Sequence, residues 1–120
     1  MPVFTRSKDE VLVLTADGDY TTGELQRVGD RALAGEEGAE PGPLLLDLSG
    51  AAGLDGKAAS DLVATGEAIG RHRTRVSRLA VVVAASFAPL FDAGSAFARA
   101  AGVETRACPS HAEALIWLRR

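Results

Sequence analysis

The chain has 120 residues, of which 47% are hydrophobic and only 5% aromatic, and its formal net charge at pH 7 is −3. This length predicts one domain, residues 1–120, with a core built from Ala, Val and Leu. The negative charge gives no electrostatic reason to expect a nucleic-acid partner, and the single cysteine, Cys108, excludes an intramolecular disulfide.

The first predicted elements are two short strands and a helix. Val3–Thr5 and Val11–Thr15 are β-rich runs whose spacing predicts an N-terminal antiparallel hairpin. Thr21 and Glu24 have the spacing of a capping box, in which each side chain binds the backbone N–H of the other residue. We therefore expect a helix that begins after Thr21 and ends near Gly35.

The middle of the chain predicts a strand, a helix and a second strand. Leu44–Leu48 is apolar except for Asp47, as expected of a strand that is covered on both faces. Apolar residues at helical spacing predict a helix from about Lys57 to Gly70. Leu79–Ala84 is the best candidate for a central strand.

The C-terminal part predicts a helix, a strand and a helix. Ser86 is the expected N-cap of a helix that runs to Ala101. Val103–Ala107 alternates in polarity, which favours an edge strand. Ser110 and Glu113 have the spacing of a second capping box, which opens the final helix.

The order of elements, ββαβαβαβα, predicts an α/β fold. Strands that alternate with helices pair in parallel through right-handed crossovers. We expect a mixed, mostly parallel sheet of about four to five strands, with an N-terminal antiparallel hairpin and about four helices.

The sequence shows no targeting or membrane segment. Its N-terminus, MPVFTRSKDE, lacks the apolar core of a signal peptide. No apolar run approaches the roughly 18 residues of a membrane span. We therefore expect a cytoplasmic protein without a membrane span.

Three segments together resemble the STAS domain, in particular the SpoIIAA-like group of small stand-alone proteins. VLVLTADGDYTTGEL resembles the opening strand, glycine turn and first helix of that family. LLLDLSGAAGLDGKAASDL resembles the strand, loop and helix in which the family places its switch. RLAVVVAASFAPLFDAGSAFARAAGVETRACPSHAEALIWLRR resembles the remaining elements, and its closing EALIWL is typical. The resemblance covers most of the chain and implies the SpoIIAA-like fold.

The resemblance also implies how the switch loop of this chain differs. In the sigma-regulating members the loop ends in an aspartate, two serines and a glycine, and the second serine is phosphorylated. The corresponding residues here are Asp55, Gly56, Lys57 and Ala58. No phosphoacceptor stands at the switch position, because a lysine replaces the serine, and Ser60 lies about one helical turn further on. A phosphorylation-controlled switch is therefore not expected.

The end of the predicted strand at Leu48 carries several polar residues. Asp47, Ser49 and Asp55 either form a small polar site or serve as turn and cap residues. Our leading hypothesis is a non-enzymatic module that binds a protein partner or a small apolar or anionic ligand, without cofactor, metal or catalytic residues. The expected contact residues lie on this loop and the following helix: Ser49, Gly50, Asp55, Gly56, Lys57, Ser60 and Asp61.

Two alternative functions stay open, and so does the possibility of a homodimer. A carrier of hydrophobic molecules would need an enclosed apolar cavity of several hundred Å³ between helices and sheet. A small enzyme that uses Asp47 or Asp55 as a base would need a raised carboxyl pKa in a concave pocket. The C-terminal helix and the N-terminal strands are both candidate surfaces for a homodimer.

The remaining reactive or charged residues carry no clear chemical pattern. His72 and His111 fall in different predicted elements, and their contexts indicate neither a Ser–His–Asp set nor a zinc site. The four arginines from Arg71 to Arg78 are interpreted as solvated charge at a helix C-terminus, with attraction of an anionic surface as the alternative. Cys108 is expected to pack rather than react.

Overall fold

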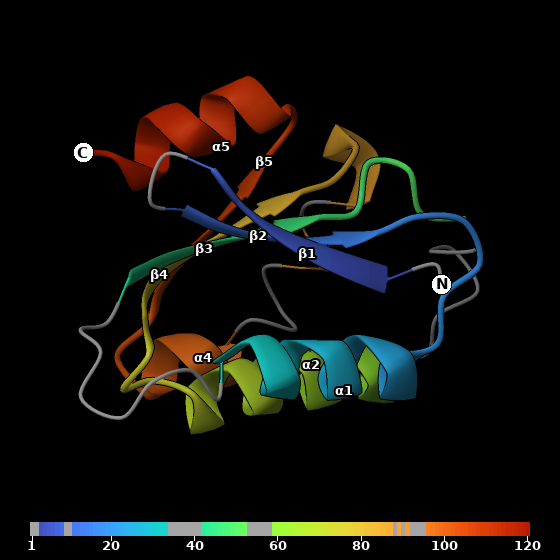
Figure 1. The fold of residues 1–120 in the computed structure, drawn as a ribbon, viewed down its shortest axis with the longest axis horizontal. Coiled ribbons are helices and arrows are strands. Elements are labelled where there is room, and N and C mark those ends of the chain that lie inside the picture. The colour runs from blue at the N-terminus through green and yellow to red at the C-terminus, as the bar shows by residue number, and fades with distance from the viewer. Residues whose placement is uncertain are drawn as a thin grey trace.

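The computed structural model describes residues 3–8, 11–33, 42–52, 59–87, 89, 91 and 96–120. These residues form one five-stranded sheet in the order β1-β2-β3-β4-β5, with helices on both faces (Figure 1). The strands are β1 (Val3–Lys8), β2 (Val11–Ala16), β3 (Gly42–Asp47), β4 (Val76–Val82) and β5 (Glu104–Cys108). Only the β1–β2 pair is antiparallel, so the predicted mixed, mostly parallel sheet is confirmed.

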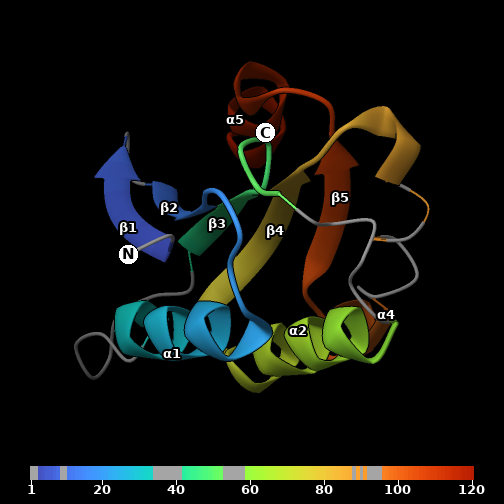
Figure 2. The same cartoon turned by 90° about the vertical axis from the view of Figure 1, so that its right-hand side faces the viewer.

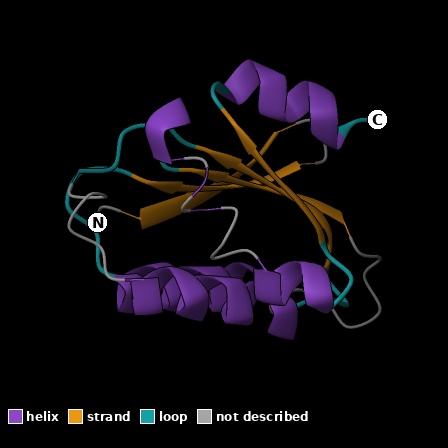
Figure 3. Ribbon diagram, turned by 180° about the vertical axis from the view of Figure 1, so that it is seen from behind, coloured by secondary structure: helices purple, strands orange, loops and turns teal. Residues whose placement is uncertain are grey.

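The helices divide unequally between the two faces of the sheet. Of the α-helices with described bounds, all except α5 lie on one face of the sheet, and α5 lies on the other (Figures 1 and 3). We call these the three-helix face and the α5 face. The helices are α1 (Thr22–Leu33), α2 (Ala59–Arg71), α4 (Ala96–Ala100) and α5 (His111–Leu118), and Ala85–Phe87 forms a short 3₁₀ helix. None of the described helices has the length and apolar character needed to cross a membrane.

The two predicted capping residues start their helices as expected. The Thr21 hydroxyl accepts a hydrogen bond from the backbone N–H of Glu24 at 3.1 Å, just before α1. The Ser110 hydroxyl accepts the corresponding bond from Glu113 at 3.2 Å and is the N-cap of α5. Both contacts satisfy a backbone donor that the helix itself leaves unpaired.

The apolar run Leu44–Leu48 supplies both cores. Leu44 and Leu46 pack into the core of the three-helix face, whereas Leu45 packs into the core of the α5 face. Successive side chains of a strand point to opposite faces, so a strand covered on both sides needs no polar alternation. The α5-face core consists of Val11, Val13, Leu45, Ala80, Val82, Cys108, Ala114, Leu115 and Leu118.

The structure corrects two predicted elements. Ser86 is not the N-cap of the helix expected from Ser86 to Ala101, because Ser86 lies inside the 3₁₀ helix; α4 covers the last described part of that stretch. Pro89 and Phe91 are both helical, and the residues between Phe91 and α4 lie outside the described part of the chain. The central strand also begins earlier than predicted, since buried Val76 already pairs with Gly42 of β3.

Candidate functional site

The polar residues at the end of β3 form a compact hydrogen-bonded group. Oδ1 of Asp47 accepts a hydrogen bond from the Ser49 hydroxyl at 2.6 Å and a second from the Ser49 backbone N–H at 2.9 Å. This is the local arrangement by which an aspartate fixes a turn two residues further on. The Asp47 side chain is only 15% exposed, whereas Ser49 is exposed at the surface. The largely buried Asp47 side chain therefore holds the exposed turn at Ser49 in place.

His111, the first residue of α5, completes this group. Its Nδ1 atom lies 3.1 Å from Oδ2 of Asp47. Because an ionised carboxylate can only accept hydrogen bonds, Nδ1 is the atom that carries the proton in this contact. The other ring nitrogen, Nε2, is buried without a hydrogen-bond partner in the described part of the chain. His111 was not among the predicted site residues.

The hydrogen bonds determine the ionisation of Asp47. Burial by itself raises the pKa of this carboxyl, but the side-chain and backbone hydrogen bonds from Ser49 and the contact with His111 outweigh burial. The pKa of Asp47 is therefore lowered from its ordinary value. A base at this position would need the opposite shift.

The order of the three side chains limits their chemistry. Asp47 lies between the hydroxyl and the imidazole, and both described contacts are made to its carboxylate. In the arrangement that activates a serine nucleophile, the imidazole lies between the serine and the acid. Here the carboxylate instead holds the Ser49 turn and the start of α5 in fixed positions.

A backbone contact fixes the other side of the same turn. Gly18 donates its N–H to the Gly50 carbonyl at 2.9 Å, and Ala52 donates to the Gly18 carbonyl at 2.7 Å. Gly18 has a φ of +66°, a conformation that favours glycine. A Cβ atom at Gly50 would meet only the Asp17 carboxylate, the end of an exposed side chain that can turn away. Gly50 is exposed, and its described tie to the neighbouring loop is its backbone carbonyl, which accepts the Gly18 N–H.

The predicted contact residues are only partly described. Ser49 and Gly50 lie together at the carboxyl edge of the sheet. Asp55, Gly56 and Lys57 lie outside the described residues, and the predicted helix start near Lys57 does too. Ser60 and Asp61 belong to the first turn of α2, which is described from Ala59 onward.

The described residues enclose a small cavity between the helices and the sheet. A cavity between α1, α2 and the three-helix face is lined mainly by apolar residues and holds about 20 Å³. One water molecule needs about 10–15 Å³, so this cavity has room for roughly one. His72 and Asp30 line its rim and join the two helices, with 2.6 Å between Nε2 and Oδ1. The carrier hypothesis needs a far larger space.

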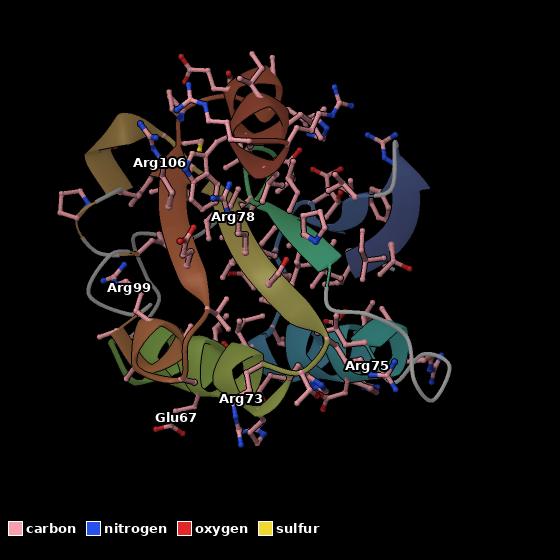
Figure 4. All side chains as sticks on the ribbon, turned by 90° about the vertical axis from the view of Figure 1, so that its left-hand side faces the viewer. Glu67, Arg73, Arg75, Arg78, Arg99 and Arg106 are labelled. Atoms are coloured by element: carbon pink, nitrogen blue, oxygen red, sulfur yellow. The ribbon has the colours of Figure 1, made fainter. Side chains whose placement is uncertain are left out.

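The arginines from Arg71 to Arg78 do not form one patch. Figure 4 shows Arg73 near the end of α2, whereas Arg78 lies on β4 below α5. Arg78 donates from Nη1 to the carbonyl oxygens of Trp117 at 3.1 Å and Arg120 at 3.0 Å. Its guanidinium carbon is 5.2 Å from the centroid of the Trp117 ring. Arg78 therefore binds the C-terminal end of α5, which corrects its interpretation as a solvated charge.

Cys108 packs in the α5-face core, as expected. It is 4% exposed, and burial raises the pKa of its thiol, which makes the reactive thiolate scarce. A groove of about 280 Å³ lies beside it, between β5 and α5, and is lined partly by Arg106 and Trp117. Among the described residues, no group of three or more His, Cys, Asp or Glu side chains could hold a metal ion.

The comparison with solved structures identifies the fold. Models of known protein families give no match to the chain, and neither do curated proteins. A solved structure of a DUF3478-family protein from Shewanella loihica PV-4, described as having a SpoIIAA-like fold, matches with a TM-score of 0.61 and 22% identity. The match covers 97% of this chain and 91% of the other. The chain therefore has the SpoIIAA-like fold that the sequence resemblance implied.

Proposed function

We propose that this protein is a non-enzymatic SpoIIAA-like regulatory or ligand-binding module that works in the cytoplasm and lacks the phosphoacceptor serine. Its contact surface comprises the Ser49–Lys57 loop and the exposed face of α2. The observation that best supports this proposal is the Ser49–Gly50 turn, which is exposed but fixed on both sides, by Asp47 and by Gly18. A turn whose backbone is already held in place loses little conformational entropy when a partner binds.

Two observations favour this proposal over the alternatives. The lowered pKa of Asp47 makes its carboxylate a weaker base than the enzyme hypothesis requires. The cavity of about 20 Å³ between the helices and the sheet is smaller than a carrier of hydrophobic molecules requires. Both observations favour recognition at the surface.

Site-directed crosslinking tests the proposed surface. Ala52 is exposed in the loop, and Ala100 is exposed on α4, so Ala52→Cys and Ala100→Cys are matched labelling sites. Ala100 ends α4, a few residues before β5, and therefore lies near the amino edge of the parallel strands, opposite the loop. Each variant would carry a thiol-reactive photocrosslinker and be captured from a lysate, while buried Cys108 stays unlabelled. Native mass spectrometry of the unlabelled protein would report any co-purifying small ligand.

The expected result is a defined adduct from Ala52→Cys that Ala100→Cys does not give. Adding Asp55→Arg to Ala52→Cys should remove this adduct, because a bulky cation replaces an acidic side chain on the same loop. If both cysteines give the same adducts, or Asp55→Arg changes nothing, the proposed surface is wrong.

A further inference from the structure

In the part of the chain that the structure describes, the outer edge of β1 has no strand paired to it. In the described sheet β1 pairs only with β2, and Figure 2 shows β1 at one margin with no labelled element beyond it. An edge strand presents unpaired N–H and C=O groups on alternate residues, which can pair with a strand of another chain. Such an edge is a candidate site for adding a strand.

This edge also carries an exposed aromatic residue. Phe4 is 46% exposed and, with Ile116 at 59%, is one of the exposed large hydrophobic residues among those described. Phe4 pairs with Thr15 and Arg6 pairs with Val13, which packs in the α5-face core. Cross-strand partners share a face, and residues two apart on a strand do too, so Phe4 and Arg6 both lie on the α5 face. An aromatic ring and a guanidinium are thus neighbours on one open edge.

We propose that a second copy of this chain pairs antiparallel along β1, with the two-fold axis at Thr5. In this register Phe4 lies opposite Arg6 of the second copy, and the symmetry repeats that pair on the other side of the axis. Residues directly opposite in an antiparallel pair have Cβ atoms about 4.5–5.5 Å apart, which permits a cation–π contact. The two sheets then join into one continuous sheet, and both Phe4 rings become covered.

The charges on β1 select this register. An axis at Arg6 would place the two Arg6 residues of the dimer opposite each other. An axis at Ser7 would place Arg6 of one copy opposite position 8 of the other, which is a lysine. Like charges directly opposite each other are destabilising. An axis at Phe4 would pair only Val3 to Thr5 within β1, whereas an axis at Thr5 pairs Val3 to Ser7. Among these registers, only the axis at Thr5 pairs Phe4 with Arg6 inside β1.

Analytical ultracentrifugation over a concentration series tests the proposal. The wild-type protein should show a concentration-dependent dimer. Phe4→Arg should weaken it by roughly tenfold or more, because two favourable contacts become two like-charge pairs. Ile116→Arg is the matched control, since it also replaces an exposed apolar side chain by arginine, and it should leave the dimer unchanged. A monomeric wild type at every concentration would overturn the proposal, as would equal effects of the two variants.

A charge exchange tests the register. In the double variant Phe4→Arg/Arg6→Glu, each new arginine faces a glutamate of the second copy, so dimerisation should return. An axis at Phe4 would instead leave the two arginines facing each other, without recovery. Failure of the double variant to dimerise, with the circular dichroism spectrum unchanged, would therefore overturn the axis at Thr5.

A crosslink provides a second measurement that does not depend on the charge variants. Residues opposite each other on antiparallel strands have Cα atoms about 4.5–5.5 Å apart, which is within disulfide range. Thr5→Cys should therefore form an interchain disulfide under mild oxidation. Thr74→Cys, at an exposed threonine in the turn before β4, should remain reduced. Equal crosslinking of the two variants, or none at Thr5→Cys, would contradict the proposed axis. This dimer is independent of the proposed loop surface, because β1 contributes no residue to it.

Discussion

Asp47 and His111 are 64 residues apart in the sequence, yet Oδ2 of Asp47 lies 3.1 Å from Nδ1 of His111. Asp47 ends β3, and His111 begins α5 shortly after β5. The carboxyl ends of parallel strands meet at one edge of a sheet, and α5 crosses back from β5 over β4 and β3. This contact therefore ties the start of the last helix to the turn proposed to bind a partner.

The first prediction concerns Asp47→Asn. An amide loses the charge-assisted hydrogen bonds, so the free energy of unfolding at pH 7 should fall by about 1–3 kcal/mol. The pKa of Asp47 is lower in the folded than in the unfolded protein, so its stabilisation is complete above the unfolded value and is lost as pH falls through the folded value. Urea titrations at pH 7 and pH 3 should show the variant and the wild type converging at acid pH.

Asp19→Asn is the control for this pH series. Asp19 is exposed in the turn after β2, so its replacement should change stability little at either pH. A constant difference between Asp47→Asn and the wild type from pH 7 to pH 3 would contradict the proposed role of the carboxylate charge.

The second prediction concerns Arg78, which binds two carbonyls of the α5 end and stacks on Trp117. Arg78→Ala should lower the free energy of unfolding by about 1–3 kcal/mol, because these carbonyls lose a charged donor. Arg78→Lys should recover only part of that loss, because an ammonium group lacks the planar fork. Trp117 is the only tryptophan in the chain, so its fluorescence reports the local change directly. Arg73→Ala, at an exposed position, should leave that signal unchanged.

The third prediction compares two glycines. Gly18→Ala should cost about 1–2 kcal/mol, because φ of +66° is unfavourable for a residue with a Cβ atom. Gly23 lies in α1, where a Cβ would meet nothing within 4 Å. Gly23→Ala should therefore stabilise the protein, by up to about 1 kcal/mol. Thermal unfolding of the two variants should give shifts of opposite sign, and shifts of the same sign would refute this explanation.

The fourth prediction concerns the cap of α1. Thr21→Ala should destabilise the protein by about 1 kcal/mol, because the Glu24 N–H loses its acceptor. Thr21→Ser keeps the hydroxyl and should be nearly neutral. Chemical denaturation distinguishes the two variants, and equal losses would show that the threonine methyl group, rather than the hydroxyl, provides the stability.

Local sequence signals predicted most of the fold. The capping residues Thr21 and Ser110 correctly predicted where two helices begin. The apolar run at Leu44–Leu48 correctly predicted a strand that is buried on both faces. Each of these signals depends on residues close together in the chain. The expected N-cap at Ser86 was wrong, because Ser86 belongs to a short 3₁₀ helix, which apolar spacing alone does not distinguish from the start of an α-helix.

The candidate site was harder to predict because its contacts are not local. Asp47 and Ser49 follow one strand and could be placed together, but His111 reaches them only through the crossing of α5 over the sheet. One signal was available: His111 directly follows an expected N-cap after an edge strand, at the same edge of a parallel sheet. The position of Arg78 likewise depends on where α5 ends, which periodicity alone does not give.

The anchoring of α5 at both ends has a consequence for the motions of the protein. His111 is tied to β3 and the last carbonyls are tied to Arg78, so fraying from either end has to break a charged contact. Among the described helices α5 alone covers its face, and the cluster beneath it is separate from the core on the other side. Its backbone amides should therefore exchange with deuterium as one cooperative group, at a rate independent of the amides in α1 and α2.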